Sequence, residues 1–516
     1  MTSPDLRAAL PGPAEISNKS PGHSYRVYWE GAGLYQSESF LNENGIPVSG
    51  PKFPAEYIVG SGMNGYTFLF RRGNSLFEAP ISYYSSTRTW DLSPGFDVYD
   101  AGFARPIRTT CLECHIGRFA PGIQGATSFP EQPFAEAAVG CENCHGPGDL
   151  HVRERGVGKA PTLPDDSIVN PAKVPHRLAD NICIRCHQGN DARVLQPGKT
   201  ISDFRPGTWL NDTLAIFKVP LSRDQHTEES DLLEHGFAMT LSKCYQTSGS
   251  LACISCHSVH QNVKAEAKTA YYRSKCLTCH SKVSCSLNPS RRQPDDCVSC
   301  HMPKRAVPTI SHTALTNHRI VSTPNEPYPD AAYADIASES PGLIHVSSAP
   351  EPDHNRVAAI TLLQAYRDLL VKAPQLRQRY LVVLSQLSSA QPNNPIVLAA
   401  AGHEQLLHGT TAELEQAAVL LRKALEFGDF DADVCMNLAE ALTRGRRFDE
   451  ASRVLKQGLA RNPYAPNLHK SLIALTMKTE NYAEAVRAMS TYLRLYPGDN
   501  RVRRLLNEVQ NIGASR

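Results

Sequence analysis

The clearest pattern of hydrophobic and polar positions lies in the last third of the chain and repeats every 34 residues. Small and apolar residues recur at helical spacing within each unit, and a proline closes it. One unit holds Leu438, Ala439, Leu442, Ala451, Leu455, Gly458 and Pro463, the next holds Leu472, Ile473, Ala485, Met489 and Pro497, and an earlier one holds Ala417, Leu421 and Ala424. The pattern predicts pairs of helices that stack into a curved solenoid over residues 356–516.

These positions are those of the tetratricopeptide repeat. An insertion near residues 409–413 shifts the first helix of the earlier unit, and residues 356–391 form a further, degenerate helix pair. Solenoids of this kind commonly bind a protein partner, although a scaffold or a contact between copies of the chain could use the same surface.

The first 105 residues follow a different pattern, rich in glycine, proline and aromatic residues. Two runs, residues 66–70 and 76–79, flank the segment 71–75 and predict a β-hairpin. Residues 60–65 match the spacing G-x-G-x-x-G, but a β-branched and aromatic run follows them instead of a helix. We therefore interpret them as a turn before a strand and not as a dinucleotide-binding loop.

Residues 106–320 contain many prolines and few long periodic stretches, and residues 321–355 form a linker rich in proline, serine and alanine. Six segments of the 106–320 zone read Cys-x-x-Cys-His, which is the attachment motif of c-type haem. Their cysteines are Cys111 and Cys114, Cys141 and Cys144, Cys183 and Cys186, Cys253 and Cys256, Cys276 and Cys279, and Cys297 and Cys300. The histidines that follow them are His115, His145, His187, His257, His280 and His301.

The spacing of this motif has a physical reason. Two thiols three residues apart can reach the two vinyl groups on one edge of a porphyrin, and the imidazole of the next residue then binds the iron. A zinc site needs no histidine after each cysteine pair, a thioredoxin-like pair occurs once, and a disulfide framework would not repeat one pentapeptide six times. The sequence therefore predicts six covalent haems, which would supply the apolar bulk that this zone lacks.

Six irons have six second axial positions. Eight histidines outside the motifs are candidates: His23, His151, His176, His226, His235, His260, His312 and His318. A haem with two histidine ligands suits electron transfer, whereas a five-coordinate haem can bind a substrate.

Three cysteines lie outside the motifs. Cys435 occupies a buried position of a repeat helix and is expected to serve packing. Cys244 and Cys285 could form a disulfide in an oxidising compartment or remain free, because sequence alone does not fix their connectivity.

The bulk composition is that of an ordinary globular chain. Its 516 residues suffice for two or three domains, with 41% hydrophobic and 20% charged residues. The formal net charge of +2 offers no basic excess that would indicate nucleic acid or an anionic membrane as partner, and haem propionates would make the loaded protein more acidic. No apolar run is long enough to cross a bilayer, and residues 1–20 lack the apolar core of a signal peptide.

The motif zone resembles bacterial multihaem cytochromes c that carry tetratricopeptide repeats and are related to the tetrahaem cytochrome of ammonia oxidisers and the hydroxylamine oxidoreductase superfamily. The resemblance covers about residues 20–320. It rests on residues 141–148 followed by His151, on Cys256-His257-Ser258-Val259-His260, on Ser242-Lys243-Cys244, on His301-Met302-Pro303, and on His312 with Thr316-Asn317-His318.

The resemblance implies a mostly α fold with a small β-containing N-terminal region (1–105), a haem-packed domain (106–320), a linker (321–355) and the solenoid (356–516). It implies that distal ligands are His151, His260, His312 and His318, and less directly His235 and His23, with His176 and His226 in reserve.

Such cytochromes often begin with a further Cys-x-x-Cys-His motif and carry an export signal, and neither is present here. Haem is attached to these motifs outside the cytoplasm, so we expect a periplasmic or extracellular protein. The chain is then a mature or truncated form, or its true start lies upstream. If a segment with a further haem precedes it, His23 belongs to that haem.

Three functions are compatible with these features. The number of histidines favours an electron carrier whose repeats dock redox partner proteins or other cytochromes. A multihaem oxidoreductase acting on a small nitrogen or sulfur compound would need one open haem, and Tyr271, Tyr272, Arg273 and Lys275 could line its pocket or bind propionates instead. A structural subunit of an extracellular cytochrome assembly would use the repeats for contacts between copies.

Overall fold

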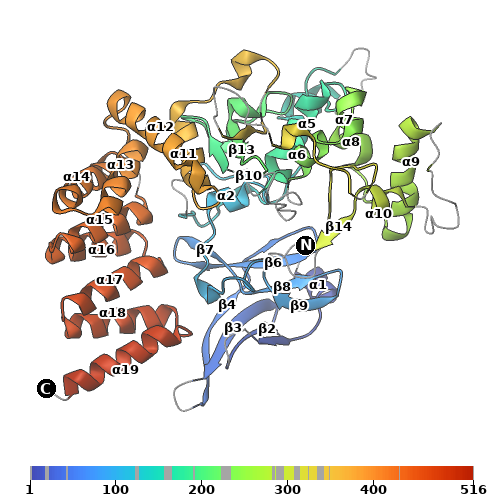
Figure 1. Cartoon of the computed structure of the whole chain (residues 1–516). Coiled ribbons are helices and arrows are strands. Elements are labelled where there is room, and N and C mark those ends of the chain that lie inside the picture. Colours follow the sequence, from blue (N-terminus) through green and yellow to red (C-terminus); the bar gives the residue numbers. More distant parts are fainter. Residues whose placement is uncertain are drawn as a thin grey trace.

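The computed structural model describes residues 3–17, 22–41, 45–121, 127–155, 165–189, 192–221, 234–281, 285, 296–306, 314–323, 325–333, 342–347, 349–428 and 430–514. A β region, a zone of short helices that carries the cysteine motifs, and a helical solenoid follow one another along the chain (Figure 1). This is the mostly α fold with a small N-terminal β part that the sequence predicts.

The β region consists of a short helix and two antiparallel sheets. One sheet has the strand order β1-β2-β3-β4, and the other has the order β5-β6-β8-β9 with β7 paired to β6. The elements are α1 (Ser3–Ala9), β1 (Ala14–Ser17), β2 (His23–Glu30), β3 (Gly33–Leu41), β4 (Pro47–Pro54), β5 (Tyr57–Val59), β6 (Gly65–Arg72), β7 (Ser75–Glu78), β8 (Ile81–Tyr84) and β9 (Thr89–Leu92). Tyr25, Phe68 and Trp90 belong to a hydrophobic core that the two sheets share.

The predicted hairpin is confirmed. Strands β6 and β7 pair with Arg72 opposite Ser75, and Gly73 in the connecting turn has a φ of +55°. The glycine-rich segment before β6 is a turn, with Gly60 at a φ of +116°, and a strand follows it as expected.

The motif zone is built from short elements. Its helices are α2 (Thr109–Leu112), α3 (Glu142–His145), α4 (Asp149–Arg155), α5 (His176–His187), α6 (His235–Thr240), α7 (Lys243–Ser248), α8 (Cys253–Cys256), α9 (Lys268–His280) and α10 (Cys297–His301). Its strands are β10 (Arg118–Phe119), β11 (Phe134–Glu136), β12 (Ala192–Leu195), β13 (Leu214–Lys218), β14 (Lys304–Ala306) and β15 (Ala314–Thr316). Single 3-10 turns lie at η1 (Gly102–Ala104), η2 (Ile201–Asp203), η3 (Leu210–Asp212), η4 (Ala265–Ala267), η6 (Asp330–Ala332), η7 (Pro352–Asn355) and η8 (Pro374–Leu376).

Part of the expected linker 321–355 packs against its neighbours. Strand β16 (Ile344–His345) pairs with β13, so that β12, β13 and β16 form one sheet. Leu343 is fully buried in a core with Phe217 of this sheet and Tyr366 of the following helix. Residues 343–345 are thus in contact with both the motif zone and the solenoid.

The solenoid begins on that sheet. Its helices are α11 (Ala359–Leu369), α12 (Arg377–Ala390), α13 (Pro395–His408), α14 (Thr411–Phe427), α15 (Ala432–Arg444), α16 (Phe448–Arg461), α17 (Pro466–Lys478), α18 (Tyr482–Leu495) and α19 (Asn500–Ala514). The apolar positions of the 34-residue repeat are buried, including Leu421, Leu455 and Met489. Cys435 is buried in α15, where its thiol lies 3.3 Å from the carbonyl oxygen of Val454, so its packing role is confirmed.

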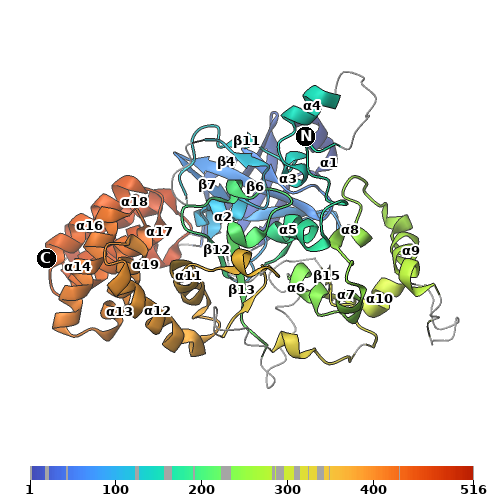
Figure 2. The ribbon, with the colours of Figure 1, turned by 90° about the horizontal axis from the view of Figure 1, so that it is seen from above.

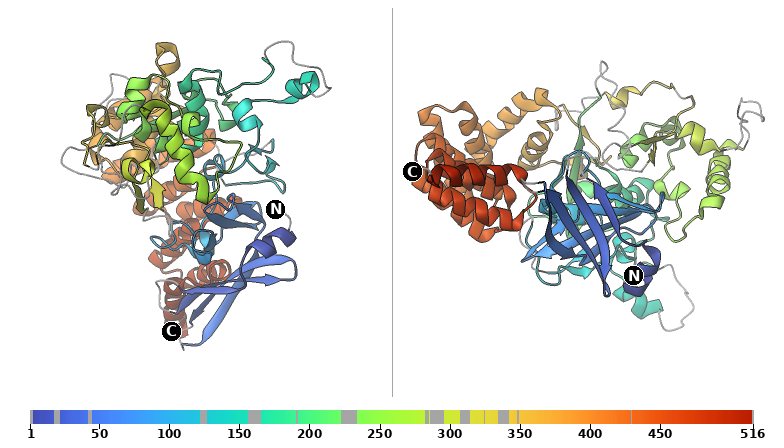
Figure 3. Two further views of the ribbon diagram at one scale, coloured as in Figure 1. Left: turned by 90° about the vertical axis from the view of Figure 1, so that its right-hand side faces the viewer. Right: turned by 90° about the horizontal axis from the view of Figure 1, so that it is seen from below.

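The β region lies beside the last helices of the solenoid (Figure 3). The guanidinium of the buried Arg72 lies 4.4 Å from the ring centroid of Phe53 and 5.0 Å from that of Tyr496. The ring of Tyr464 meets that of Phe77 edge-on at 6.3 Å. The C-terminal end of the solenoid is thus in contact with the chain's own β region. Within the described residues, no helix has the length and apolar character that a membrane crossing requires.

Candidate haem-binding sites

Each Cys-x-x-Cys-His segment lies on a short helix or directly beside one. The motifs fall, in chain order, at α2, α3, the end of α5, α8, the end of α9, and α10. Positions three apart share one face of a helix, so the two cysteines of a motif lie on the same side. This is the arrangement that attachment to one porphyrin edge requires.

All fifteen cysteines are free thiols in the structure. Cys244 and Cys285 are therefore not joined, and the disulfide considered for them has no support. Within the motifs, thiols of different segments lie close together: Cys114 lies beside Cys186, Cys183 beside Cys253, and Cys276 beside Cys297. The first, third and fourth motifs are thus neighbours, as are the fifth and sixth. Figure 2 shows α9 and α10, which carry the last two motifs, at the end of the molecule away from the solenoid.

Three motif histidines lie near a second histidine at nearly equal ring distances, and the rings of two of these second histidines, His235 and His318, also contact each other at 4.2 Å. The ring centroids of His145 and His260 are 6.0 Å apart, those of His187 and His235 are 5.8 Å apart, and those of His257 and His318 are 6.1 Å apart. The second member of each pair, His235, His260 or His318, is one of the predicted distal ligands.

These separations match what one iron between two imidazoles demands. A metal–imidazole bond of about 2 Å on each side places the two ring centroids ~6 Å apart. Among the described residues, no group of three or more histidine, cysteine or acidic side chains could hold a bare metal ion. A low-spin haem iron would take two axial ligands from the protein, and pairs of histidines are the arrangement that would fit it.

Hydrogen bonds at the other ring nitrogen orient several of these imidazoles. The Nδ1 atoms of His145, His301 and His318 lie 2.7, 2.6 and 3.0 Å from the carbonyl oxygens of Val169, Val321 and Thr316, listed in the same order. When Nδ1–H donates to a carbonyl, Nε2 carries the free lone pair and can bind a metal. The hydroxyl of Tyr272 lies 3.4 Å from Nδ1 of His257.

The local electrostatics keep the paired histidines neutral. Burial, followed by the proximity of His187, lowers the pKa of His235 to about 4. Burial, followed by the proximity of His235, lowers the pKa of His318 to about 3. A neutral imidazole is the form that binds a metal, so these sites are ready for coordination at neutral pH.

The packing of the motif helices indicates a missing apolar surface. No residue of α3, α8, α9 or α10 is buried, although α9 has thirteen residues. By contrast, α11 of the solenoid buries residues such as Leu363 and Tyr366. A helix in a protein is held mainly by an apolar face packed on a partner. Covalent haem supplies such a partner, and the residues present therefore fit the group.

The remaining candidate ligands are less uniform. His151 in α4 bonds to Asp165, and His176 at the start of α5 lies edge-on to Tyr245 with centroids 6.2 Å apart. His23 lies in β2, where its Nε2 atom is 3.1 Å from Oε2 of Glu38. This contact ties His23 to the β region, and its role as a distal ligand stays a prediction. His226 and His312 lie outside the described residues.

Ring contacts in the described part of the chain join none of His115, His280 and His301 to a second histidine, so their distal partners stay a prediction.

Sequence reasoning missed the residues that support the histidines. A buried ion pair joins Lys218 to Glu234, the residue before His235, and Asp165 holds His151. In each pair the two residues are many positions apart in the sequence and follow no periodic pattern, so the sequence alone does not indicate that they contact each other.

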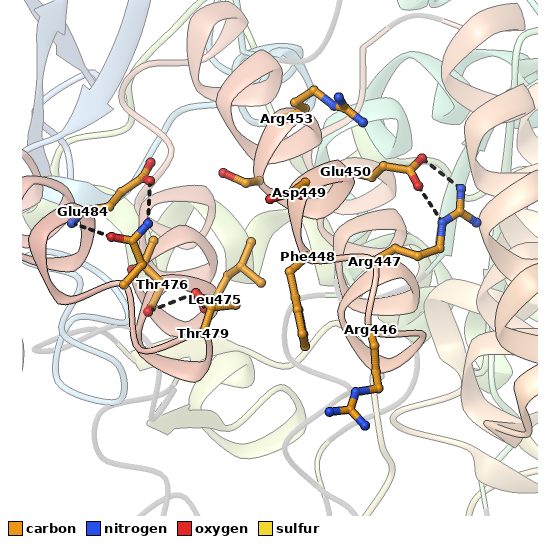
Figure 4. A pocket seen from close by; sticks show the side chains of 12 residues that line it. Arg446, Arg447, Phe448, Asp449, Glu450, Arg453, Leu475, Thr476, Thr479 and Glu484 are labelled. Carbon is orange, nitrogen blue, oxygen red and sulfur yellow. Dashed lines mark hydrogen bonds and ion pairs between the residues drawn. The ribbon is translucent and has the colours of Figure 1, made fainter.

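Two cavities lie on the described surface. One, of about 710 Å³, is lined by motif residues Cys141 and His145 together with His151, a size within the range of about 300–1,000 Å³ for cofactor pockets. The other, of about 560 Å³, lies on the solenoid between the turns that follow α15 and α17 (Figure 4). Charged residues of both signs line it, among them Arg446, Asp449 and Glu484.

No family model matches the chain. It is similar to the multiheme cytochrome MtrA of Shewanella baltica, with 22% identity over 220 residues, which are 40% of this chain and 57% of that protein. It is also similar to the C-type polyheme cytochrome OmcB of Geobacter sulfurreducens, with 24% identity over 261 residues, 43% of this chain and 31% of that protein. The chain thus matches about half or a third of the length of these relatives.

Solved structures similar to the chain include MamA, with 17% identity and a TM-score of 0.23 over 30% of this chain and 79% of that one. Another is YrrB, a TPR protein with an unusual peptide-binding site, with 15% identity and a TM-score of 0.26 over 31% of this chain and 77% of that one. The chain is a distant relative of multihaem cytochromes, and its C-terminal part is a helical-repeat solenoid.

Proposed function

We propose that the chain binds six haems covalently and carries electrons along them. The observation that carries this proposal is the set of three histidine pairs at 5.8–6.1 Å, each with one member in a Cys-x-x-Cys-His motif. The distant similarity to multihaem cytochromes supports it.

The motif cysteines hold the six haems in this proposal, and the motif histidines are the proximal ligands. The pairs assign three distal ligands: His260 opposite His145, His235 opposite His187, and His318 opposite His257. The haems of His115, His280 and His301 take theirs from the remaining candidates His151, His312 and His23, with His176 and His226 in reserve.

A haem supplies a one-electron couple whose potential the protein sets through axial ligands, hydrogen bonds and burial. In this chain, hydrogen bonds to the imidazole rings are among these contributions. Backbone carbonyls of Val169, Val321 and Thr316 fix the orientation of three imidazoles. In this proposal the haems of neighbouring motifs lie close enough to pass electrons, and the proximity of Cys114 to Cys186, of Cys183 to Cys253 and of Cys276 to Cys297 supports it.

The solenoid docks a redox partner or another cytochrome in this proposal. Its C-terminal helices already contact the β region, so we assign partner binding to the remaining surface, which includes the cavity of Figure 4. Because haem is attached to such motifs outside the cytoplasm, the protein works in the periplasm or outside the cell.

The test is to purify the full chain after expression with a c-type haem-attachment system and to determine its haem number and spin state. Pyridine haemochrome and intact mass should give six haems, and optical and electron paramagnetic resonance (EPR) spectra should be low-spin throughout. A high-spin haem that shifts on addition of nitrite, hydroxylamine or cyanide would overturn the pure carrier and favour the oxidoreductase. Self-association in a concentration series by analytical ultracentrifugation would instead favour the structural subunit.

A further inference from the structure

The segment after the second motif contains a histidine, His151, whose ring is hydrogen-bonded to a carboxylate. His151 lies in α4 and lines the 710 Å³ cavity together with Cys141 and His145 of that motif. The cavity places His151 beside the second motif, and because His260 is the distal ligand proposed for the iron of that motif, His151 is left for another of the six haems.

A carboxylate fixes this imidazole. Oδ2 of Asp165 lies 2.6 Å from Nδ1 of His151. The other oxygen, Oδ1, accepts the backbone N–H of Ser167 at 3.0 Å and also its hydroxyl. Nε of Arg155 lies 3.7 Å from Oδ2. The carboxylate is thus held from several sides and cannot turn away from the histidine without losing these partners.

A carboxylate oxygen at Nδ1 accepts the ring N–H more strongly than a backbone carbonyl oxygen does, because the carboxylate carries negative charge. It fixes the tautomer with the lone pair on Nε2 and makes that nitrogen a stronger electron donor.

Other histidines of this zone have a different hydrogen-bond acceptor at Nδ1. His145, His301 and His318 donate to neutral backbone carbonyls. A more basic imidazole stabilises ferric over ferrous iron, so the haem that His151 binds should have a lower potential than carbonyl-supported haems.

We propose that Asp165 is a positioning residue for His151, which presents Nε2 to a haem iron and lowers the potential of that one haem. The inference rests on the proposed function, in which His151 is a distal ligand.

The experiment is a potentiometric titration of the purified holoprotein, followed by optical and EPR spectra, for the wild type and three variants. Asp165→Asn keeps the shape of the side chain and removes its charge. Glu154→Gln removes the same charge from an exposed residue of α4 that does not line the cavity. His151→Met replaces the imidazole by a ligand that raises haem potentials.

Asp165→Asn should keep every haem low-spin and raise one midpoint potential. Loss of an outer partner typically changes metal-site properties by about tenfold or more. A tenfold change in the ferric-to-ferrous ratio at fixed potential corresponds to about 59 mV for a one-electron couple. Glu154→Gln should change no single haem in this way, and His151→Met should raise the same midpoint potential that Asp165→Asn raises.

Equal titrations for Asp165→Asn and Glu154→Gln would overturn the role of Asp165. Unchanged potentials in His151→Met would show that His151 binds no iron, which ends this inference but leaves the electron carrier standing. A wild type with fewer than six low-spin haems contradicts the proposed function itself, before any variant is compared.

Discussion

The imidazole rings of His145 and His260 lie 6.0 Å apart between centroids, with planes 10° from parallel. His145 belongs to the second motif, whereas His260 follows the fourth, so the pair joins segments far apart in the chain. Nδ1 of His145 also lies 2.7 Å from the carbonyl oxygen of Val169. One proposed haem site is therefore built by three separate segments, and assembly of the zone depends on all of them.

Replacing His260 by alanine tests this pairing. The iron bound by His145 would lose its distal ligand, so one haem of six should become high-spin and bind carbon monoxide or cyanide, while the others stay low-spin. EPR spectroscopy counts the two classes. His408→Ala, at an exposed position of the solenoid, is the control and should leave the spectrum unchanged.

A second prediction concerns haem number. The double variant Cys297→Ala and Cys300→Ala removes both attachment thiols of α10, so intact mass should fall by one haem and the other five should remain. Cys435→Ala provides the contrast, because this buried thiol packs in the solenoid. It should keep all haems and lose about 1 kcal/mol of stability. Loss of a haem in the Cys435 variant would contradict the division between the two groups of cysteines.

Local patterns account for the parts of the structure that could be predicted. The motif cysteines recur three apart on helical turns, and the repeat positions such as Leu455 and Met489 are buried as their spacing indicates. The insertion near residues 409–413 is also visible. Helix α14 has seventeen residues, whereas α16 has fourteen.

Long-range pairing explains what the sequence did not reveal. In β3, the polar residues Gln36, Ser37 and Glu38 are buried, so the strand lacks the alternation that identifies strands. Gln36 exchanges side-chain hydrogen bonds with the backbone of Ile81 in the second sheet, which compensates for its burial. The short strand β16 is similarly invisible locally, since only its pairing with β13 makes it a strand.

The contact between the β region and the solenoid gives a third prediction. A Cβ at Gly73 would lie 2.8 Å from the ring of Tyr464, and the φ of +55° already disfavours alanine. Gly31 has a similar φ of +59°, but a Cβ there would meet nothing within 4 Å. Both alanine variants are strained, and only Gly73→Ala also disturbs the interface.

Gly73→Ala should therefore be less stable than Gly31→Ala by about 1–3 kcal/mol, the usual cost of an added group in a packed site. Urea unfolding followed by near-ultraviolet circular dichroism measures the difference. Equal losses for the two variants would mean that Tyr464 does not pack on the hairpin in solution.

The last prediction is a pH dependence of stability caused by His345. Its Nε2 lies 2.8 Å from Oδ1 of Asn211, its ring packs on Phe217, and burial lowers its pKa to about 4. The unfolded chain, with a histidine pKa of about 6.5, binds the proton more readily than the folded one. The contribution of His345 to the free energy of unfolding is therefore fully present above about pH 6.5 and is lost as the pH falls towards 4. The loss at pH 5 is about 2 kcal/mol.

Urea unfolding of the holoprotein at pH 7 and pH 5 should show this loss in the wild type and in His354→Gln, a half-exposed control that bonds to Asp212. It should be absent in His345→Gln, because glutamine carries no titrating proton, and an unchanged pH dependence in that variant would assign the effect to other groups.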